Sequence, residues 1–245
     1  MREQVYTRED TQRGPLILVN ASHPLAAGSK PRLCPALPGE ENVLLERHAA
    51  RMLAACVRAA GGLGRIKAVS GYRSRKEQRQ IWDDSLRESG EAFTRSYVAR
   101  PGCSEHETGL AIDLAADAPF IDFIRPHLPR DGVYGEFRRI APLFGWIERY
   151  PAGKESVTGI ASEPWHFRYV GAPHAEIMAQ RGLCLEEYLA LLRGGGLRFA
   201  YRGGAVRIFR IGCGPQGVTL PLAVRFTVSG DNDGGLLLTV REESA

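Results

Sequence analysis

The sequence has no long apolar run, and this absence excludes two classes of protein. A membrane span needs about 18 or more consecutive apolar residues, and no stretch of the 245 residues reaches that length. The first apolar run, residues 16–19, is also shorter than the roughly 7–15 apolar residues of a secretory signal. We therefore expect a cytoplasmic protein without a membrane span.

Cysteine is scarce and its spacing is irregular. The chain has five cysteines, an odd number, and none of them forms a Cys-x-x-Cys pair: Cys34, Cys56, Cys103, Cys184 and Cys213. A disulfide framework normally has an even number of cysteines, and a cysteine zinc knuckle needs closely spaced pairs. The sequence therefore favours reduced thiols in a reducing compartment.

Neither sign of charge dominates the chain. Lys and Arg number 32 against 28 acidic residues, a net charge of +4, and no run of basic residues concentrates the excess. This balance gives no support for a nucleic-acid partner. Hydrophobic residues make up 44% of the chain, as in a soluble globular protein with a core.

Helical and extended patterns occur in mixed order, without a regular strand–helix alternation, and this favours an α+β fold. The proline-rich stretch 1–39 is expected to be irregular, apart from a short strand at 16–19. The periodicity predicts helices at 40–60, 74–89, 118–127, 134–144, 173–181 and 185–192, and strands at 66–72, 110–115, 146–150 and 165–170.

Three consecutive glycines at 194–196 mark an internal boundary, after which helical patterns stop. Four strands are expected beyond it, at 197–201, 205–211, 220–229 and 236–241. We therefore predict two domains, residues 1–193 and a small all-β appendage at 197–245. Because strands this short do not stand alone, the appendage is expected to pack on the first domain or to pair across a homodimer.

Two short segments carry side chains that bind metals. His106 and Asp113 lie seven residues apart, and Glu-Pro-Trp-His follows at residues 163–166. Catalytic zinc sites usually take three ligands from His and carboxylate side chains and leave the fourth position to water. We predict that His106, Asp113 and His166 hold one zinc ion.

The expected strand at 110–115 supports a ligand role for its carboxylate. Side chains alternate along a strand, so Ala111, Asp113 and Ala115 share one face while the leucine and isoleucine neighbours face the core. A carboxylate between two alanines has room for an ion beside it.

Glu163 lies three residues before His166, and both side chains can reach one ion from an extended or turning segment. A metal lowers the pKa of its bound water toward 7, so a nearby carboxylate can take the proton. We predict that Glu163 is the base and later returns the proton to the leaving amine.

Arg73 follows the strand expected at 66–72, where a guanidinium can point into a cleft. It could stabilise the oxyanion on a scissile carbonyl, clamp a substrate carboxylate, or serve as a structural ion-pair partner. Gln78, on the next helix, could add an amide contact or lie exposed.

These motifs resemble the VanY/VanX/VanXY group of zinc D,D-peptidases. The resemblance rests on three motifs. They are Tyr-Arg-Ser at 72–74, the segment that begins with Ser-x-His at Ser104 and ends at Asp113, and Glu-Pro-Trp-His-Phe-Arg-Tyr at 163–169. It covers roughly residues 16–192. It implies a small α+β fold with a central antiparallel sheet and flanking helices. It also implies zinc at His106, Asp113 and His166, with Glu163 as the base.

The resemblance further implies that Arg73 steadies the carbonyl oxygen and that Ser104 and Gln78 position substrate. Trp165, between base and ligand, packs the site wall or stacks on substrate, and we count it among the candidate substrate-binding residues. Glu105 and Glu107 flank His106. They are either solvated, or one of them holds the second nitrogen of the His106 imidazole.

The implied substrates are peptidoglycan precursors that end in D-Ala-D-Ala, as the stem pentapeptide or the free dipeptide. Two alternatives remain open. One is an L,D-carboxypeptidase that acts on the tetrapeptide stem, because the metal ligands act on the peptide bond and do not determine the stereochemistry of the residue before the cut. The other is a non-catalytic module that binds precursors. Vancomycin resistance and ordinary wall maintenance would use the same chemistry.

Overall fold

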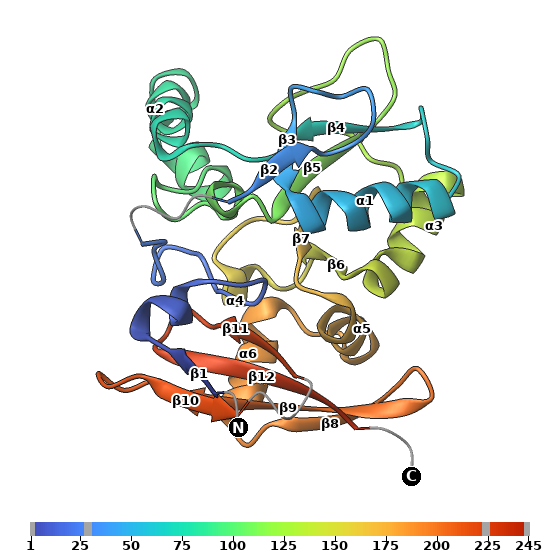
Figure 1. Ribbon diagram of the computed structural model, residues 1–245. Coiled ribbons are helices and arrows are strands. Elements are labelled where there is room, and N and C mark those ends of the chain that lie inside the picture. Colours follow the sequence, from blue (N-terminus) through green and yellow to red (C-terminus); the bar gives the residue numbers. More distant parts are fainter. Residues whose placement is uncertain (1–2, 27–30, 222–225, 243–245) are drawn as a thin grey trace. The chain divides into compact units, whose positions relative to one another are not determined.

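The computed structural model describes residues 3–26, 31–221 and 226–242, and the chain divides into two compact units (Figure 1). Unit 1 joins residues Met1–Val19 to Leu185–Ala245, and unit 2 comprises Asn20–Cys184. This division differs from the boundary expected near residue 194, because the first nineteen residues and one helix group with the C-terminal strands.

Unit 2 is built around a four-stranded sheet in the order β4-β5-β7-β6. Its strands are β4 (Ile66–Ser70), β5 (Ala111–Ala116), β7 (Glu163–Tyr169) and β6 (Trp146–Tyr150), and every neighbouring pair is antiparallel. A separate hairpin pairs β2 (Leu33–Pro35) with β3 (Leu44–Glu46). The expected α+β class with a small antiparallel sheet is confirmed.

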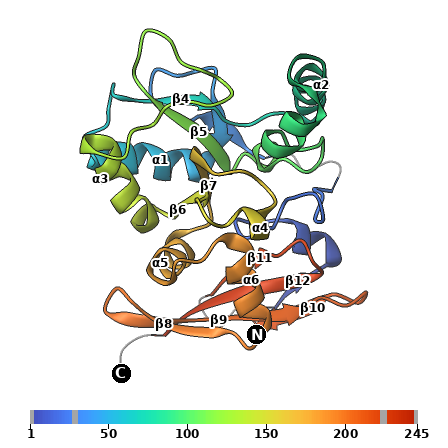
Figure 2. The ribbon, with the colours of Figure 1, turned by 180° about the vertical axis from the view of Figure 1, so that it is seen from behind.

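The helices of unit 2 flank this sheet. They are α1 (Arg47–Ala59), α2 (Arg75–Tyr97), α3 (Gly132–Ile140), α4 (Glu155–Thr158) and α5 (Ala172–Arg181), with 3₁₀ turns η2 (Glu105–Thr108) and η3 (Ala141–Phe144). Helices α1 and α3 contact each other, and α2 lies away from them at the other side of the unit (Figures 1 and 2).

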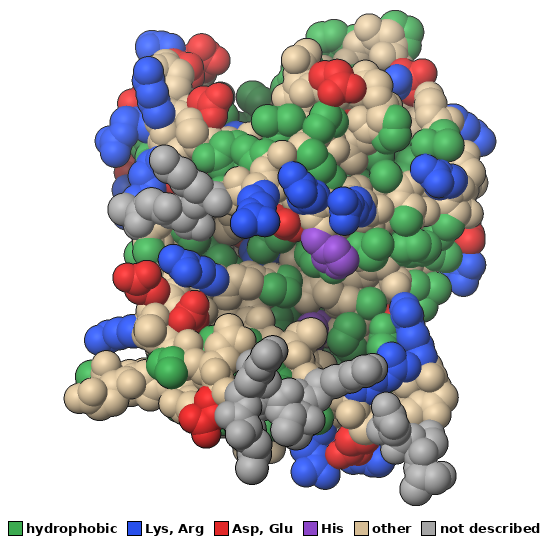
Figure 3. Space-filling model, in the orientation of Figure 1, with side chains coloured by type: hydrophobic (Ala, Val, Ile, Leu, Met, Phe, Trp, Pro, Cys, Tyr) green, Lys and Arg blue, Asp and Glu red, His purple; other side chains and the backbone are tan. Residues whose placement is uncertain are grey.

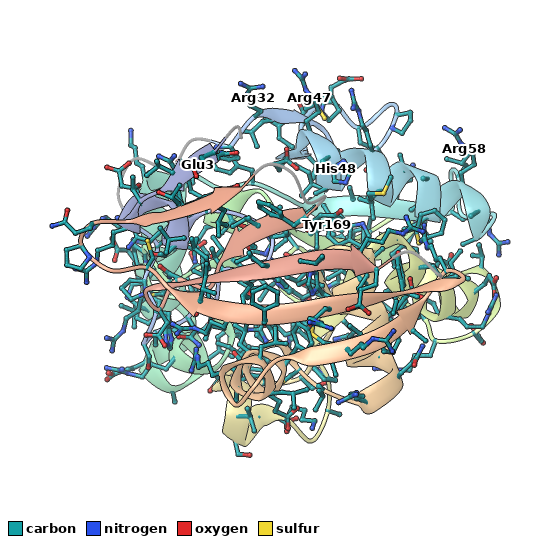
Figure 4. The ribbon with its side chains drawn as sticks, turned by 60° about the horizontal axis from the view of Figure 1, so that its bottom comes forward. Glu3, Arg32, Arg47, His48, Arg58 and Tyr169 are labelled. Carbon is teal, nitrogen blue, oxygen red and sulfur yellow. The ribbon has the colours of Figure 1, made fainter. Side chains whose placement is uncertain are left out.

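Helix α1 supplies one wall of the core. Its apolar residues recur at helical spacing, and Leu53 and Cys56 are fully buried against Ile112, Leu114 and Trp146 of the sheet. Near the start of α1, His48 lies edge-on to Tyr169, with ring centroids 5.6 Å apart (Figure 4). Helix α1 therefore packs against the sheet that carries the candidate site.

Replacing Leu53 by Ala should lower the free energy of unfolding by about 2–5 kcal/mol, because the side chain is fully buried in this cluster. Denaturant titration of the whole chain, followed by circular dichroism, measures the loss. Arg58→Ala on the same helix is the matched control, since Arg58 is exposed and points outward (Figure 4), and we expect a change within about 0.5 kcal/mol. Equal losses in both variants would contradict the assigned core.

Helix α2 begins where the sequence predicts, at an N-cap formed by Ser74. The Ser74 side chain accepts a hydrogen bond from the Glu77 N–H, and Glu77 accepts from the Ser74 N–H at 2.7 Å, which completes a capping box. The helical backbone is broken at Gly90, which has φ of 80° and ψ of 171°, so the end expected near residue 89 agrees with the structure. A second helical segment follows this kink and reaches Tyr97, and the label α2 covers both segments.

Unit 1 contains a four-stranded antiparallel sheet in the order β11-β12-β9-β8 and a pair β1-β10. Its elements are β1 (Glu3–Tyr6), η1 (Arg8–Gln12), α6 (Leu185–Arg193), β8 (Leu197–Tyr201), β9 (Gly204–Gly212), β10 (Val218–Pro221), β11 (Phe226–Gly230) and β12 (Gly235–Glu242). The strand expected at 220–229 therefore corresponds to β10 and β11, while residues 222–225 lie outside the described residues.

Long-range hydrogen bonds place the N-terminal segment in unit 1. The Gly230 N–H donates to the Arg13 carbonyl at 2.6 Å, and the Leu18 N–H donates to the Asp231 carbonyl at 3.3 Å. Residues 16–19 are buried but form no strand, so the strand predicted there is wrong. The Leu16 N–H bonds to the Ser229 hydroxyl instead of to a strand partner.

Two helix predictions in unit 2 also need correction. Residues 44–46 pair with β2, and the Glu46 carboxylate caps α1 by accepting from the His48 and Ala49 N–H groups, so the helix expected from residue 40 begins at Arg47. Residues 118–127 form no helix. There the Asp122 side chain accepts from the N–H groups of Ile124 and Arg125, a turn that competes with helix.

Candidate metal centre and active-site cleft

The sheet register brings two predicted ligands together. Asp113 on β5 lies directly opposite His166 on β7. Residues opposite each other in an antiparallel pair project from the same face of the sheet. The carboxylate Oδ1 of Asp113 consequently lies 2.9 Å from Nδ1 of His166.

An irregularity in β7 brings Glu163 to the same place. In a regular strand, residues three apart project from opposite faces. The β6–β7 register shifts between the pairs Glu148–Phe167 and Tyr150–Glu163, leaving extra residues on β7. Pro164, which has no N–H to donate, lies in this bulge. Glu163 Oε2 thereby comes within 3.8 Å of His166 Nδ1.

The third ligand comes from η2, immediately before β5. Gly109 ends this turn with φ of 72°, a conformation that favours glycine, and lets the chain enter β5. His106 Nδ1 lies 2.7 Å from the carbonyl oxygen of Gly71, which can only accept, so Nδ1 carries the proton. Its Nε2 is left as the ligand atom, 3.3 Å from Asp113 Oδ2.

Glycine at position 71 is required for this contact. The Tyr72 N–H donates to the Leu44 carbonyl at 2.6 Å, and a Cβ on Gly71 would collide with that carbonyl oxygen. The close approach of the two segments holds the Gly71 carbonyl against the imidazole of His106.

Within the described residues, His106, Asp113 and His166 offer two imidazole nitrogens and one carboxylate oxygen that all lie within 4.8 Å of one another. All three side chains are buried. Two imidazoles and a carboxylate form the donor set of catalytic zinc sites that keep one position open. The cluster fits a zinc ion by donor type, spacing and burial.

The charges of the cluster suit a cation. Burial and the Arg73 guanidinium lower the pKa of His106 to about 4, so this imidazole is neutral and available as a ligand. Burial alone would raise the pKa of Asp113, but the two histidines hold it well below its usual range. The pKa of His166 is raised to about 9: burial opposes this, but the Asp113 and Glu105 carboxylates outweigh it.

Glu163 differs from Asp113 because its pKa rises. Burial is the main cause and raises the pKa to about 7, against the lowering effect of His166. A carboxylate with a pKa near neutrality is well matched to take up and release a proton at physiological pH. This is the property that a general base needs.

Arg73 lies at the edge of the metal cluster and makes three contacts. Its Nε donates to the Ser70 hydroxyl at 3.0 Å, Nη1 to Gln78 Oε1 at 3.1 Å and Nη2 to Asp113 Oδ2 at 3.3 Å. The Gln78 amide nitrogen donates to the Ala99 carbonyl at 2.7 Å. Gln78 is therefore buried and bonded to protein at both ends of its amide, so it holds the guanidinium in place.

These groups lie at the floor of a cleft of about 620 Å³ in unit 2. The volume is within the roughly 300–1,000 Å³ of ligand pockets. Ser104 and Trp165 also line it, as do Arg73, Gln78 and Glu163, so the candidate substrate-contacting residues share one cavity. Ser104 is buried and its side chain makes no cap hydrogen bond to η2. Figure 3 shows the hollow between α2 and the loop that follows β5.

The walls of the cleft come from two elements. One is α2, which lines the cleft from Glu77 to Tyr97. The other is the loop after β5, where Phe123 and Ile124 line the cleft and are largely exposed. Arg125 connects the walls, because its guanidinium lies 5.8 Å from the ring centroid of Phe93 and 6.0 Å from that of Tyr97 on α2.

Both glutamates beside His106 are buried, so the solvated alternative for them is wrong. Glu107 accepts from the Gly102 N–H at 2.6 Å and from Arg75 Nε at 3.0 Å. Glu105 pairs with two fully buried arginines, Arg149 at 2.7 Å and Arg168 at 3.0 Å. Sequence patterns missed both arginines as parts of the site, because charged residues on strands ordinarily indicate exposed faces.

The family model described as VanY: D-alanyl-D-alanine carboxypeptidase matches residues 42–172, more than half of the chain. The chain belongs to the VanY family. The matched range contains every ligand candidate, the candidate base Glu163 and the arginine at 73.

Two relatives match most of the chain. The bifunctional D-Ala-D-Ala dipeptidase and carboxypeptidase VanXYC of Enterococcus gallinarum is 42% identical over 175 residues, which span 71% of this chain and 92% of that protein. The crystal structure of the D,D-dipeptidase VanXYg with a D-Ala-D-Ala phosphinate analog superposes with a TM-score of 0.94 at 39% identity. It covers 98% of this chain and 99% of that one, so the C-terminal strands have counterparts there.

Two further solved structures match a smaller share of the chain. The D,D-pentapeptidase VanY from a VanB-type cassette, solved with Zn(II), has a TM-score of 0.61 at 34% identity and covers 71% of this chain and 98% of that one. The LD-carboxypeptidase LdcB gives the same TM-score and identity, covering 71% of this chain and 84% of that one. None of the helices among the described residues is long and apolar enough to cross a membrane.

Proposed function

We propose that this chain is a zinc-dependent D,D-peptidase that releases D-alanine from peptidoglycan precursors ending in D-Ala-D-Ala. The observation that carries the proposal is the meeting of His106, Asp113 and His166 within 4.8 Å of one another, with Glu163 3.8 Å from His166. The names of the VanXYC and VanXYg relatives support this substrate.

The three ligand residues would hold one zinc ion, which would polarise the scissile carbonyl and lower the pKa of water toward 7. Glu163 takes the proton from the attacking water and returns it to the nitrogen of the departing D-alanine. Arg73 donates hydrogen bonds to the carbonyl oxygen as negative charge develops on it. Ser104 and Trp165 contact the peptide from the cleft wall, while Gln78 orients Arg73.

Arg73→Lys should lower kcat for D-alanine release by about 10²–10³-fold, because lysine keeps the charge but not the three fixed donors. Steady-state kinetics distinguish the two roles open to Arg73. A fall in kcat indicates support of the oxyanion, whereas a rise in KM alone indicates a clamp on the substrate carboxylate. Arg79→Lys, at an exposed position on α2 shortly after Arg73, should change neither value. An unaltered kcat/KM in Arg73→Lys would remove Arg73 from the mechanism.

The rate should also depend on pH through Glu163. The base acts as a carboxylate, so kcat/KM must fall as pH drops through its pKa. Burial sets that pKa to about 7, and a bound cation lowers it further, so the acid limb lies below about pH 7 with unit slope. The measurement is a pH profile with zinc content checked at each point. A flat profile between pH 7 and 5 would contradict Glu163 as the base.

The cleft favours a stem peptide as well as the free dipeptide, because it extends along α2 beyond the metal cluster. We test the scope with four substrates: free D-Ala-D-Ala, the pentapeptide precursor, and the matched tetrapeptide stem with an L,D or a D,D bond at the cut. Release from the first two supports the proposal. Release from the L,D tetrapeptide alone would make the chain an L,D-carboxypeptidase like LdcB.

A binding module without catalysis has no use for a buried carboxylate of raised pKa, so the intact base argues against it. The possible homodimer through the C-terminal strands and the cytoplasmic setting remain predictions. Sedimentation of the full chain tests the first, and a monomer at micromolar concentration would exclude it.

A further inference from the structure

Glu105 is buried beside the metal cluster, where it faces His166. Its side chain has no exposed surface, and neither has that of Arg149 or Arg168. Arg149 Nε and Arg168 Nη1 both contact Oε1, at 2.7 and 3.0 Å. The other oxygen, Oε2, faces His166 Nε2 at 3.6 Å.

This arrangement determines which nitrogen of His166 would give up its proton to a metal ion. A carboxylate held between two guanidinium groups is ionised and can only accept hydrogen bonds. Both nitrogens of His166 face a carboxylate, Nε2 that of Glu105 and Nδ1 that of Asp113, so both carry hydrogen in the absence of a metal. Because Glu105 is not one of the clustered ligands and keeps the hydrogen of Nε2, the proton that a bound zinc ion would displace is the one on Nδ1. That atom is the one 2.9 Å from Asp113 and 3.8 Å from Glu163.

With zinc bound, the two candidate ligand histidines would be in opposite tautomers, each held by a different acceptor. The backbone carbonyl of Gly71 fixes the proton of His106 on Nδ1, and Glu105 fixes that of His166 on Nε2. A backbone carbonyl cannot move away from its histidine by rotating a side chain. Glu105 can, and the two buried arginines prevent it.

We propose that Glu105 is a positioning residue for zinc binding: held by Arg149 and Arg168, it orients His166 so that Nδ1 is the ligand atom. This inference rests on the proposed zinc site. Carboxylate partners of ligating histidines typically contribute about 10–100-fold to metal affinity. Glu105 belongs to this class by geometry, because it approaches a ligand histidine and is not one of the three clustered ligand residues.

The test compares Glu105→Gln with Glu107→Gln in the full chain. Both glutamates are buried, lie on the same 3₁₀ turn and pair with arginine, but Glu107 faces Arg75 and the Gly102 N–H instead of a ligand. Zinc affinity is measured by competition with a chromogenic chelator. We expect a 10–100-fold weaker affinity in Glu105→Gln and less than about 3-fold in Glu107→Gln. Equal affinities in wild type and Glu105→Gln, or equal losses in the two variants, would overturn the proposal.

A second measurement uses the wild type, so it tests the proposal even if Glu105→Gln fails to fold. Long-range ¹H–¹⁵N spectra of the zinc-loaded wild type identify the metal-bound nitrogen of each histidine. We expect Nδ1 bound and Nε2 protonated in His166, and the reverse in His106. Zinc bound through Nε2 of His166 would overturn the inference. A wild type that binds no zinc would instead refute the proposed function.

Discussion

Replacing Glu163 by Gln is expected to lower kcat for D-alanine release by about 10²–10⁴-fold while zinc remains bound. Glutamine preserves the size of the side chain but cannot take a proton from water. The residue lies 3.8 Å from His166 and is not one of the three clustered ligand atoms, so its loss should spare the metal. Steady-state kinetics and zinc content measured on the same preparation check both parts of the expectation.

The matched control for this substitution is Glu155→Gln, a change of an exposed acid on α4 outside the cleft. It should leave kcat and zinc content as in the wild type. Wild-type turnover in Glu163→Gln would show that another group removes the proton. Loss of zinc together with activity would instead make Glu163 a ligand.

His166→Ala should abolish measurable D-alanine release. It should also weaken zinc binding by more than the 10–100-fold expected for loss of Glu105, which only orients a ligand. The substitution removes one of three donors and leaves Asp113 without its 2.9 Å neighbour. Zinc affinity by chelator competition, with turnover in excess zinc, measures both effects.

His127→Ala serves as the control, because His127 is exposed and lies outside the metal cluster. It should bind zinc like the wild type. If His166→Ala also kept wild-type zinc affinity, the ion would have to bind elsewhere, and the ligand set would be wrong.

Local patterns were sufficient to predict much of unit 2. The alternation around Asp113 predicted β5 with its carboxylate away from the leucine and isoleucine core, and the structure confirms this strand and its buried neighbours. The start of α2 was predictable near residue 74, because the capping box of Ser74 and Glu77 is contained within four consecutive residues. The resemblance to VanY-type peptidases, carried by short motifs, is confirmed by the family match over residues 42–172.

Features that depend on distant residues were not predictable in this way. The sequence shows Glu105 beside His106, but its burial follows from Arg149 and Arg168, which come from two other strands. The bulge that brings Glu163 to His166 could have been suspected from Pro164, since proline inside a strand indicates an edge or a bulge.

The division into units was missed for the same reason. Residues 11–18 have no helical or alternating pattern of their own, and they are held by hydrogen bonds to residues 229–232, more than two hundred positions away. No window of local sequence contains that information.

The central claim is that zinc held by His106, Asp113 and His166 supports cleavage of D-Ala-D-Ala. The most direct test is D-alanine release from free D-Ala-D-Ala and from the pentapeptide precursor by the full chain, before and after removal of metal with a chelator and again after zinc is restored. We predict release that disappears with the chelator and returns with zinc. Release that persists undiminished in the metal-free protein, or no release from either substrate with zinc bound, would contradict the account.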